Sequence, residues 1–131
     1  MTTNYYDTFI SVADDCPVAK SEIPVVKNDK PTIASMQYEA VSTGPYKYTS
    51  DDVIFNIYSE RNGIENSRVE REKYFSKGQP CFRSSPLGKR YGWGVHSDAE
   101  GKIAIYPVES AEYAKLSKNP DIKQLKAMRS K

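Results

Sequence analysis

Apolar residues recur along the middle of the chain at the three- and four-residue spacing that is typical of an amphipathic helix. The clearest case lies between residues 49 and 63, where four apolar side chains would share one helix face: Val53, Ile54, Ile57 and Tyr58. Thr49 can cap the first turn, and Asp52 can reach back to it as in a capping box. The Asn62-Gly63 pair ends the helix, because glycine readily adopts the left-handed backbone of a C-cap.

Weaker patterns predict three more helices. Residues 32–41 fit both a helical stripe and strand alternation, and we favour a helix that Thr32 caps and Gly44-Pro45 ends. Residues 67–78 predict a short, strongly charged helix that stops at its terminal glycine. Residues 110–118 predict a last helix with a serine cap and an Asn-Pro stop.

Strand signals lie on both sides of these helices. Residues 6–13 are rich in β-branched and aromatic side chains and predict a first strand. Residues 90–107 predict a β-hairpin around the polar turn at 97–101. Two prolines indicate an extended connector over residues 21–31. The tail, residues 121–131, fits either a last turn of helix or an edge strand, and its pattern does not choose between them.

This order of elements predicts an α+β fold in a single domain, residues 1–131, with a small, mostly antiparallel sheet packed by three to four helices. The hairpin over 90–107 is part of that sheet. A chain of 131 residues is long enough to bury one core without staples. Its content of 38% hydrophobic and 27% charged residues is typical of a globular protein.

Composition narrows the classes of function. A net charge of +2 is too small to argue for a nucleic-acid partner, and no apolar run is long enough to span a membrane. The N-terminus lacks the basic and apolar regions of a signal peptide, so we expect a cytoplasmic protein. There, Cys16 and Cys81 are expected to be free thiols. With a single histidine they cannot complete a zinc site, and the sequence indicates no metal and no cofactor.

Potential chemistry concentrates in residues 79–96, which contain the single tryptophan and the single histidine of the chain. Strand alternation gives one face to Tyr91, Trp93 and Val95, and the other face to Gly92, Gly94 and His96. The two glycines would leave a trough of bare backbone. Such a trough indicates either the close approach of a ligand or the packing of another part of the chain.

Basic side chains precede this strand. Arg83, Lys89 and Arg90 lie close in sequence to the rings of Tyr91 and Trp93, a combination that suits anionic groups. We therefore predict a non-catalytic binding module with a cationic and aromatic groove for a small anionic ligand. The predicted ligand-binding residues are Arg83, Arg90, Tyr91, Gly92, Trp93 and Gly94.

A cysteine-dependent enzyme or a thiol-redox protein is the alternative. The basic neighbours of Cys81 would favour its thiolate form if they converge on it, and His96 could then act as the base. The spacing of these two candidate catalytic residues fixes no geometry, because a loop and a strand lie between them. Whether the protein is an enzyme stays open at this point.

Five stretches carry a resemblance to known proteins. They are Asn-Tyr-Tyr-Asp-Thr-Phe-Ile at 4–10, Asp-Cys-Pro at 15–17, Phe-Ser-Lys-Gly-Gln-Pro-Cys at 75–81, Lys-Arg-Tyr-Gly-Trp-Gly at 89–94 and Lys-Ala-Met-Arg-Ser-Lys at 126–131. On these stretches the chain resembles, over essentially its whole length, a bacterial family of similar size that is a domain of unknown function. The resemblance implies a bacterial, cytosolic protein of one domain. It implies no activity, cofactor or catalytic residue.

Overall fold

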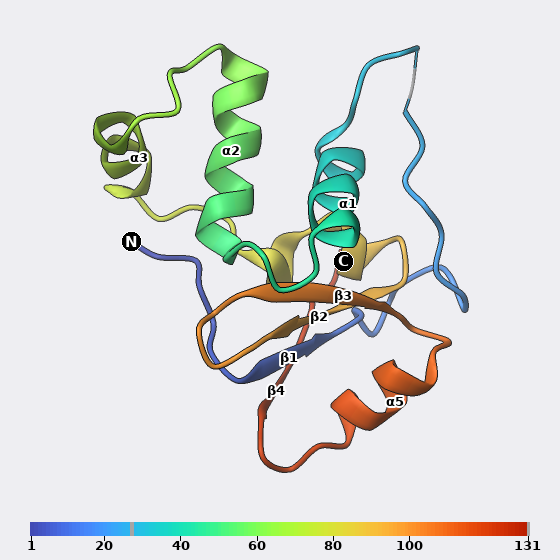
Figure 1. The fold of residues 1–131 in the computed structure, drawn as a ribbon. Helices are drawn as coiled ribbons and strands as arrows, with labels where there is room; N and C mark the ends of the chain where they lie inside the picture. The colour runs from blue at the N-terminus through green and yellow to red at the C-terminus, as the bar shows by residue number, and fades with distance from the viewer. Residues whose placement is uncertain (27, 131) are drawn as a thin grey trace.

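The computed structural model describes residues 1–26 and 28–130. These residues form five α-helices, one short 3₁₀-helix and one four-stranded sheet, and the predicted α+β class is confirmed (Figure 1). The strands are β1 (Thr8–Ser11), β2 (Trp93–Ser97), β3 (Ile103–Pro107) and β4 (Lys123–Lys126). The helices are α1 (Ile33–Thr43), α2 (Ser50–Asn62), α3 (Arg68–Phe75), α4 (Pro86–Lys89) and α5 (Ala111–Ser117), with the 3₁₀-helix η1 (Phe82–Ser84).

The sheet has the strand order β3-β2-β1-β4. β1 pairs antiparallel with β2 and parallel with β4, and β2 pairs antiparallel with β3, so the sheet is mostly antiparallel. The hairpin predicted over residues 90–107 is confirmed as β2 and β3. α1 and α2 lie on one face of the sheet and α5 lies on the other, while α3 sits on the outer side of α2 (Figure 1).

Local capping signals set the helix ends. The hydroxyls of Thr32 and Thr49 each accept a hydrogen bond from the backbone N–H three residues on. The side chain of that residue accepts one from the backbone N–H of the threonine, so α1 and α2 both begin with a capping box. Gly63 ends α2 at φ 62°, the left-handed backbone predicted for it. Ser67 and Ser110 cap α3 and α5. The four helices predicted from the sequence are therefore confirmed.

The remaining helix, α4, lies in the basic stretch where no helix was predicted. Pro86 occupies its first turn. Proline has no backbone N–H, and no N–H of the first turn has a partner within the helix, so no hydrogen bond is lost there. Ser85 Oγ accepts a hydrogen bond from the Leu87 N–H at 3.1 Å and donates one to Gln37 Oε1 of α1 at 2.6 Å. Leu87 is fully buried in the core. α4 is thus fastened to α1 on one side and to the core on the other.

The main core lies between the sheet and the layer formed by α1, α2 and α4. Ile10 and Val95 are partners in the β1–β2 ladder, and both side chains are buried in this core. Phe9 points to the opposite face of the sheet, because side chains alternate along a strand. Its ring meets the ring of Tyr113 from α5 edge-on, with the centroids 5.0 Å apart. Both faces of the sheet are therefore packed.

The tail forms an edge strand, which settles the alternative that the sequence left open. β4 adds to β1 in parallel, with Thr8 opposite Lys123 and Ser11 opposite Lys126. Beyond the strand Ala127 is buried, and the N–H of Met128 donates to the carbonyl of Arg83 in η1 at 2.7 Å. The last residue of the chain lies outside the described residues.

The connector between β1 and α1 forms no helix in its described part, as predicted for residues 21–31. Lys27 lies outside the described residues. Pro24 is buried, and Asn28 and Asp29 turn the chain with φ values of 52° and 58°. In the residues that the structure describes, no helix has both the length and the apolar character needed to cross a membrane.

The N-terminal segment is clamped to the first turn of α2. Asp51, only 9% exposed, accepts hydrogen bonds at Oδ1 from the N–H and the hydroxyl of Thr3, both at 2.6 Å. Its Oδ2 accepts the hydroxyl of Thr2 at 2.7 Å, and its own N–H donates to Asn4 Oδ1 at 2.9 Å. A negative charge is also favoured at this end of a helix dipole. Asp51 therefore holds three consecutive residues in place, Thr2 and Thr3 through its carboxylate and Asn4 through its backbone N–H.

Candidate functional site

A hollow of about 620 Å³ lies at the N-terminal end of α1, where the connector, α4 and the end of α2 meet. Four basic side chains line it: Lys30, Arg61, Lys89 and Arg90. Tyr91 adds an aromatic wall, and no carboxylate is among the described lining residues. We call this hollow the cationic groove.

The charges of the cationic groove lie outside the ion pairs of the described part of the chain. None of its four basic residues takes part in a salt bridge there. The Arg61 guanidinium donates one hydrogen bond, to the carbonyl of Pro31 at 3.0 Å. A guanidinium carries five N–H donors, so this bond orients the group and leaves donors for a ligand. The positive end of the α1 dipole adds to the same field.

α4 positions two of the four charges. Lys89 is its last residue, and the N–H of Arg90 donates to the carbonyl of Pro86 at 2.8 Å and closes the final turn. Because Ser85 ties the start of α4 to α1 and Leu87 anchors it in the core, the backbone beneath both cations is fixed.

The connector forms another wall of the groove. The N–H of Glu22 donates to the carbonyl of Tyr91 at 2.8 Å, and the Glu22 carbonyl accepts the indole N–H of Trp93 at 2.9 Å. Gly92, at φ 81°, permits this close approach, since an added Cβ would lie 3.0 Å from the connector backbone. These contacts hold the connector beside the start of β2, and Val25 further along it lines the groove.

The structure places the predicted ligand-binding residues in different surroundings. Arg90 and Tyr91 line the cationic groove. Arg83 instead bonds to the C-terminal segment, with its Nε donating to the carbonyl of Lys126 at 2.8 Å. Trp93 is 9% exposed and belongs to the main core. The space beside Gly92 is filled by the backbone of the connector at Ser21.

Gly94 decides between the two interpretations of the glycine trough. An added Cβ would lie 2.5 Å from Cζ of Phe9 and 2.6 Å from Cε2 of Tyr113, so two rings already occupy the space. Glycine at this position serves the packing of α5 on the sheet, which was the second interpretation. The cationic groove lies on the other side of the sheet, with α1.

Sequence reasoning missed Lys30 and Arg61, and it noted Lys89 only as part of a basic cluster. Lys30 comes shortly before α1, and Arg61 lies in the last turn of α2. Because α1 and α2 are consecutive helices that run antiparallel, the end of α2 returns beside the start of α1 (Figure 1). The short connection between the two predicted helices was the signal that could have placed Arg61 near the groove.

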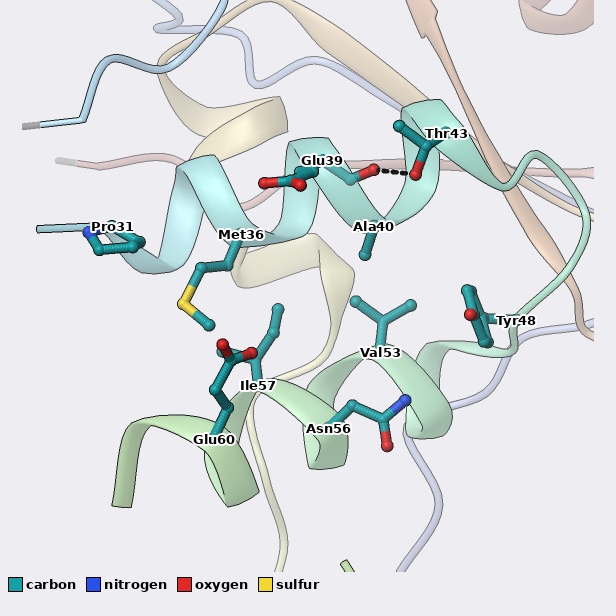
Figure 2. Close-up of a pocket in the computed structure, with 10 residues that line it drawn as sticks. All are labelled: Pro31, Met36, Glu39, Ala40, Thr43, Tyr48, Val53, Asn56, Ile57 and Glu60. Carbon is teal, nitrogen blue, oxygen red and sulfur yellow. Dashed lines mark hydrogen bonds between the residues drawn. The ribbon is translucent and has the colours of Figure 1, made fainter. Parts of the chain in front are cut away.

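A second hollow, of about 320 Å³, lies between α1 and α2 (Figure 2). Its apolar floor is formed by side chains that point toward one another from the two helices, Met36, Ala40, Val53 and Ile57. Glu39 from α1 and Glu60 from α2 line it as well, and no basic side chain is among its described lining residues. This acidic groove has the opposite charge to the cationic groove and disfavours an anion.

The candidate catalytic residues belong to two separate hydrogen-bond networks. Cys81 Sγ lies 3.2 Å from the hydroxyl of Tyr5, and burial raises the pKa of that tyrosine to about 12. His96 Nδ1 lies 2.8 Å from the hydroxyl of Tyr46, which also lies 2.7 Å from the hydroxyl of Tyr106. Within residues 1–26 and 28–130, no hydrogen bond joins the thiol to the imidazole.

The environment of His96 leads to a testable pH dependence. Burial lowers the pKa of this imidazole below 6.5, although Asp98 and Asp7 act in the opposite direction. The unfolded chain then binds the proton more readily, so the free energy of unfolding should fall as the pH drops from 6.5 to the folded-state pKa. Because the chain has a single histidine, an NMR titration of its ring signals reports this pKa directly.

The His96→Gln variant is the control for that titration. In this variant the free energy of unfolding should not fall between pH 6.5 and the folded-state pKa of His96. Chemical denaturation at several pH values measures this. A midpoint at or above 6.5 for the folded protein would contradict a pKa lowered by the partial burial of the ring.

Among the described residues, no group of three or more His, Cys, Asp or Glu side chains is placed to hold a metal ion. The fold and its grooves define a small α+β protein with a cationic and an acidic hollow on its helical side. The chain belongs to a family of unknown function, DUF6157, whose model matches residues 1–131. The resemblance noted in the sequence is thereby confirmed at the level of the family. No curated protein and no solved structure matches the chain.

Proposed function

We propose that this protein is a non-catalytic binding module, one domain over residues 1–131, that takes a small anionic ligand in the cationic groove. The observation that carries the proposal is the gathering of four basic side chains, from separate parts of the chain, around one hollow without a described carboxylate. Like charges repel, so this arrangement carries a cost in free energy, which water and salt screen because Lys30, Arg61 and Arg90 are exposed. A bound anion would remove that cost and stabilise the folded state.

The lining residues suit recognition better than catalysis. Arg61 and Arg90 can each form two parallel hydrogen bonds to a carboxylate or a phosphate, while Lys30 and Lys89 act as point charges. Tyr91 offers a ring as wall area and a hydroxyl as a further partner. No Cys, His, Asp or Glu is among the described lining residues, so Lys30, Lys89 and Tyr91 are the proton-transfer groups of the described lining, and no carboxylate, imidazole or thiol stands beside them there.

The same features favour a small ligand over a nucleic acid. The basic residues line a hollow and do not extend over a face, and the net charge of the chain is only +2. We also propose a bacterial, cytoplasmic protein, since the resemblance implies it and both Cys16 and Cys81 are free thiols.

Calorimetric titration with inorganic pyrophosphate and with citrate tests the proposal. We expect binding by the unmodified protein and a loss of affinity of about tenfold or more in the double variant Lys89→Ala/Arg90→Ala, equivalent to about 1.4 kcal/mol for each factor of ten. The reason is that each charge-assisted hydrogen bond contributes about 1.5–3 kcal/mol.

Two control variants make the titration specific. The pair Lys115→Ala/Lys118→Ala removes the same charge from exposed positions on α5 and just beyond it, and should leave the affinity nearly unchanged. The pair Glu39→Gln/Glu60→Gln alters only the acidic groove and should also leave it unchanged. Equal losses in the groove pair and the α5 pair would contradict the proposal, as would the absence of binding of both anions at millimolar concentration.

A further inference from the structure

We infer that the ligand of the cationic groove is an amphiphile, with an anionic phosphate or carboxylate head and an aliphatic chain. This inference rests on the proposed function and names the class of its ligand. The argument comes from the part of the groove that the four charges do not cover. That part is a wall of exposed apolar side chains.

Two aliphatic side chains line the groove and are open to solvent. Val25 is 64% exposed and Ile33 is 47% exposed. They do not stand alone, since four of the eight large hydrophobic side chains that are exposed in the described structure lie between residues 23 and 33: Ile23, Val25, Val26 and Ile33. Single exposed apolar residues need no explanation, whereas two that line the same hollow beside its basic residues offer an apolar surface to a ligand.

The apolar wall is held in place from both ends. Before Val25, Pro24 is buried and the bonds of Glu22 fasten the connector to the start of β2. After it, Ile33 is the first residue of α1, whose start is fixed by the capping box of Thr32. Fixed neighbours on both sides reduce the conformational entropy that these two side chains lose when a ligand chain packs on them.

The charges and the apolar wall belong to the same hollow. Lys30 lies between Val25 and Ile33 in the sequence, and Lys89 and Arg90 come from α4. A purely polar anion would neutralise the cations and leave both aliphatic side chains in water. An aliphatic chain attached to the anion would cover them, at a gain of about fourfold in affinity for each methylene that becomes fully buried.

The volume is consistent with such a ligand. At about 620 Å³ the hollow lies within the range of sites that hold whole small molecules, whereas a phosphate ion alone would fill a small part of it. The acidic groove offers a similar apolar floor with the opposite charge, so the sign of the head group decides which hollow an amphiphile enters.

A chain-length series tests this inference. Inorganic phosphate, butyl phosphate and octyl phosphate are titrated calorimetrically, each below its micelle concentration, so that only single molecules bind. We expect octyl phosphate to bind at least about tenfold more tightly than butyl phosphate, because four further methylenes can pack on the apolar wall. Octyltrimethylammonium, with the same chain and the opposite charge, should not compete for the cationic groove.

The double variant Val25→Ser/Ile33→Ser should remove the advantage of the longer chain and bind the two alkyl phosphates within about threefold of each other. Both positions are exposed, so the variant is expected to fold, and its melting temperature checks this. Val69→Ser, at a 62% exposed position on α3, is the matched control and should keep the advantage.

The outcomes separate this inference from the proposed function. Equal affinity for butyl and octyl phosphate, or a chain-length advantage that survives in Val25→Ser/Ile33→Ser, would overturn the amphiphile. If Lys89→Ala/Arg90→Ala still weakened all three phosphates in that case, the proposed function would stand. If octyl phosphate bound to Lys89→Ala/Arg90→Ala as tightly as to the unmodified protein, the head group would have no role. Both the amphiphile inference and the proposed function would then be refuted.

Discussion

Replacing Leu87 with alanine is expected to lower the free energy of unfolding by about 2–5 kcal/mol, the range for a fully buried leucine. Leu87 is 0% exposed and lies in the main core, where the truncated side chain would leave a cavity. Denaturation with urea measures the loss, and the dependence of the free energy of unfolding on urea concentration should stay unchanged.

The same substitution should also weaken anion binding, although Leu87 does not line the groove. Lys89 and Arg90 follow on the same short helix, and its hold on the core depends on this side chain. Val69→Ala, at an exposed position, should change stability by no more than about 0.5 kcal/mol. A loss below about 1 kcal/mol for Leu87→Ala would show that α4 is not anchored as described.

Asp51→Ala is expected to destabilise the protein by about 2–4 kcal/mol. The carboxylate accepts three hydrogen bonds from Thr2 and Thr3, and charged acceptors contribute about 1.5–3 kcal/mol per bond, part of which is regained when the segment relaxes into water. Thr3 is only 5% exposed, so its N–H would otherwise be left buried without a partner.

Hydrogen exchange measures the local part of this effect, since the amide of Thr3 should lose its protection in Asp51→Ala. Asp51→Asn keeps the size of the side chain and removes the charge. Its free energy of unfolding should lie between those of the unmodified protein and Asp51→Ala. Asp121→Ala, at an exposed position, is the control and should be nearly neutral. Protection of the Thr3 amide that persists in Asp51→Ala would contradict the clamp.

The features that could be predicted from the sequence are those that neighbouring residues decide. The capping boxes at Thr32 and Thr49 and the left-handed Gly63 involve partners within four residues, so the pattern alone located the ends of α1 and α2. The hairpin of β2 and β3 is equally local. The pairing of β4 with β1 joins the two ends of the chain, and no periodicity in the short tail could reveal it.

The cationic groove was predicted in part, for a similar reason. Arg90 and Tyr91 lie in the stretch where basic and aromatic residues are concentrated, and both line the groove. Arg83 lies in the same stretch, but it is taken up by the C-terminal segment that packs against η1. Lys30 and Arg61 line the groove only because α1 packs on α2, and this packing cannot be predicted from the composition of the chain.

The position of β1 has a consequence for how the protein is made. Phe9 and Ile10 are translated well before their neighbours in the sheet, β2 and β4. Until β2 and β4 are translated, this strand is therefore an apolar segment with both edges unpaired, which is the kind of segment that chaperones protect. The nascent chain is expected to depend on such protection until Lys123–Lys126 has emerged.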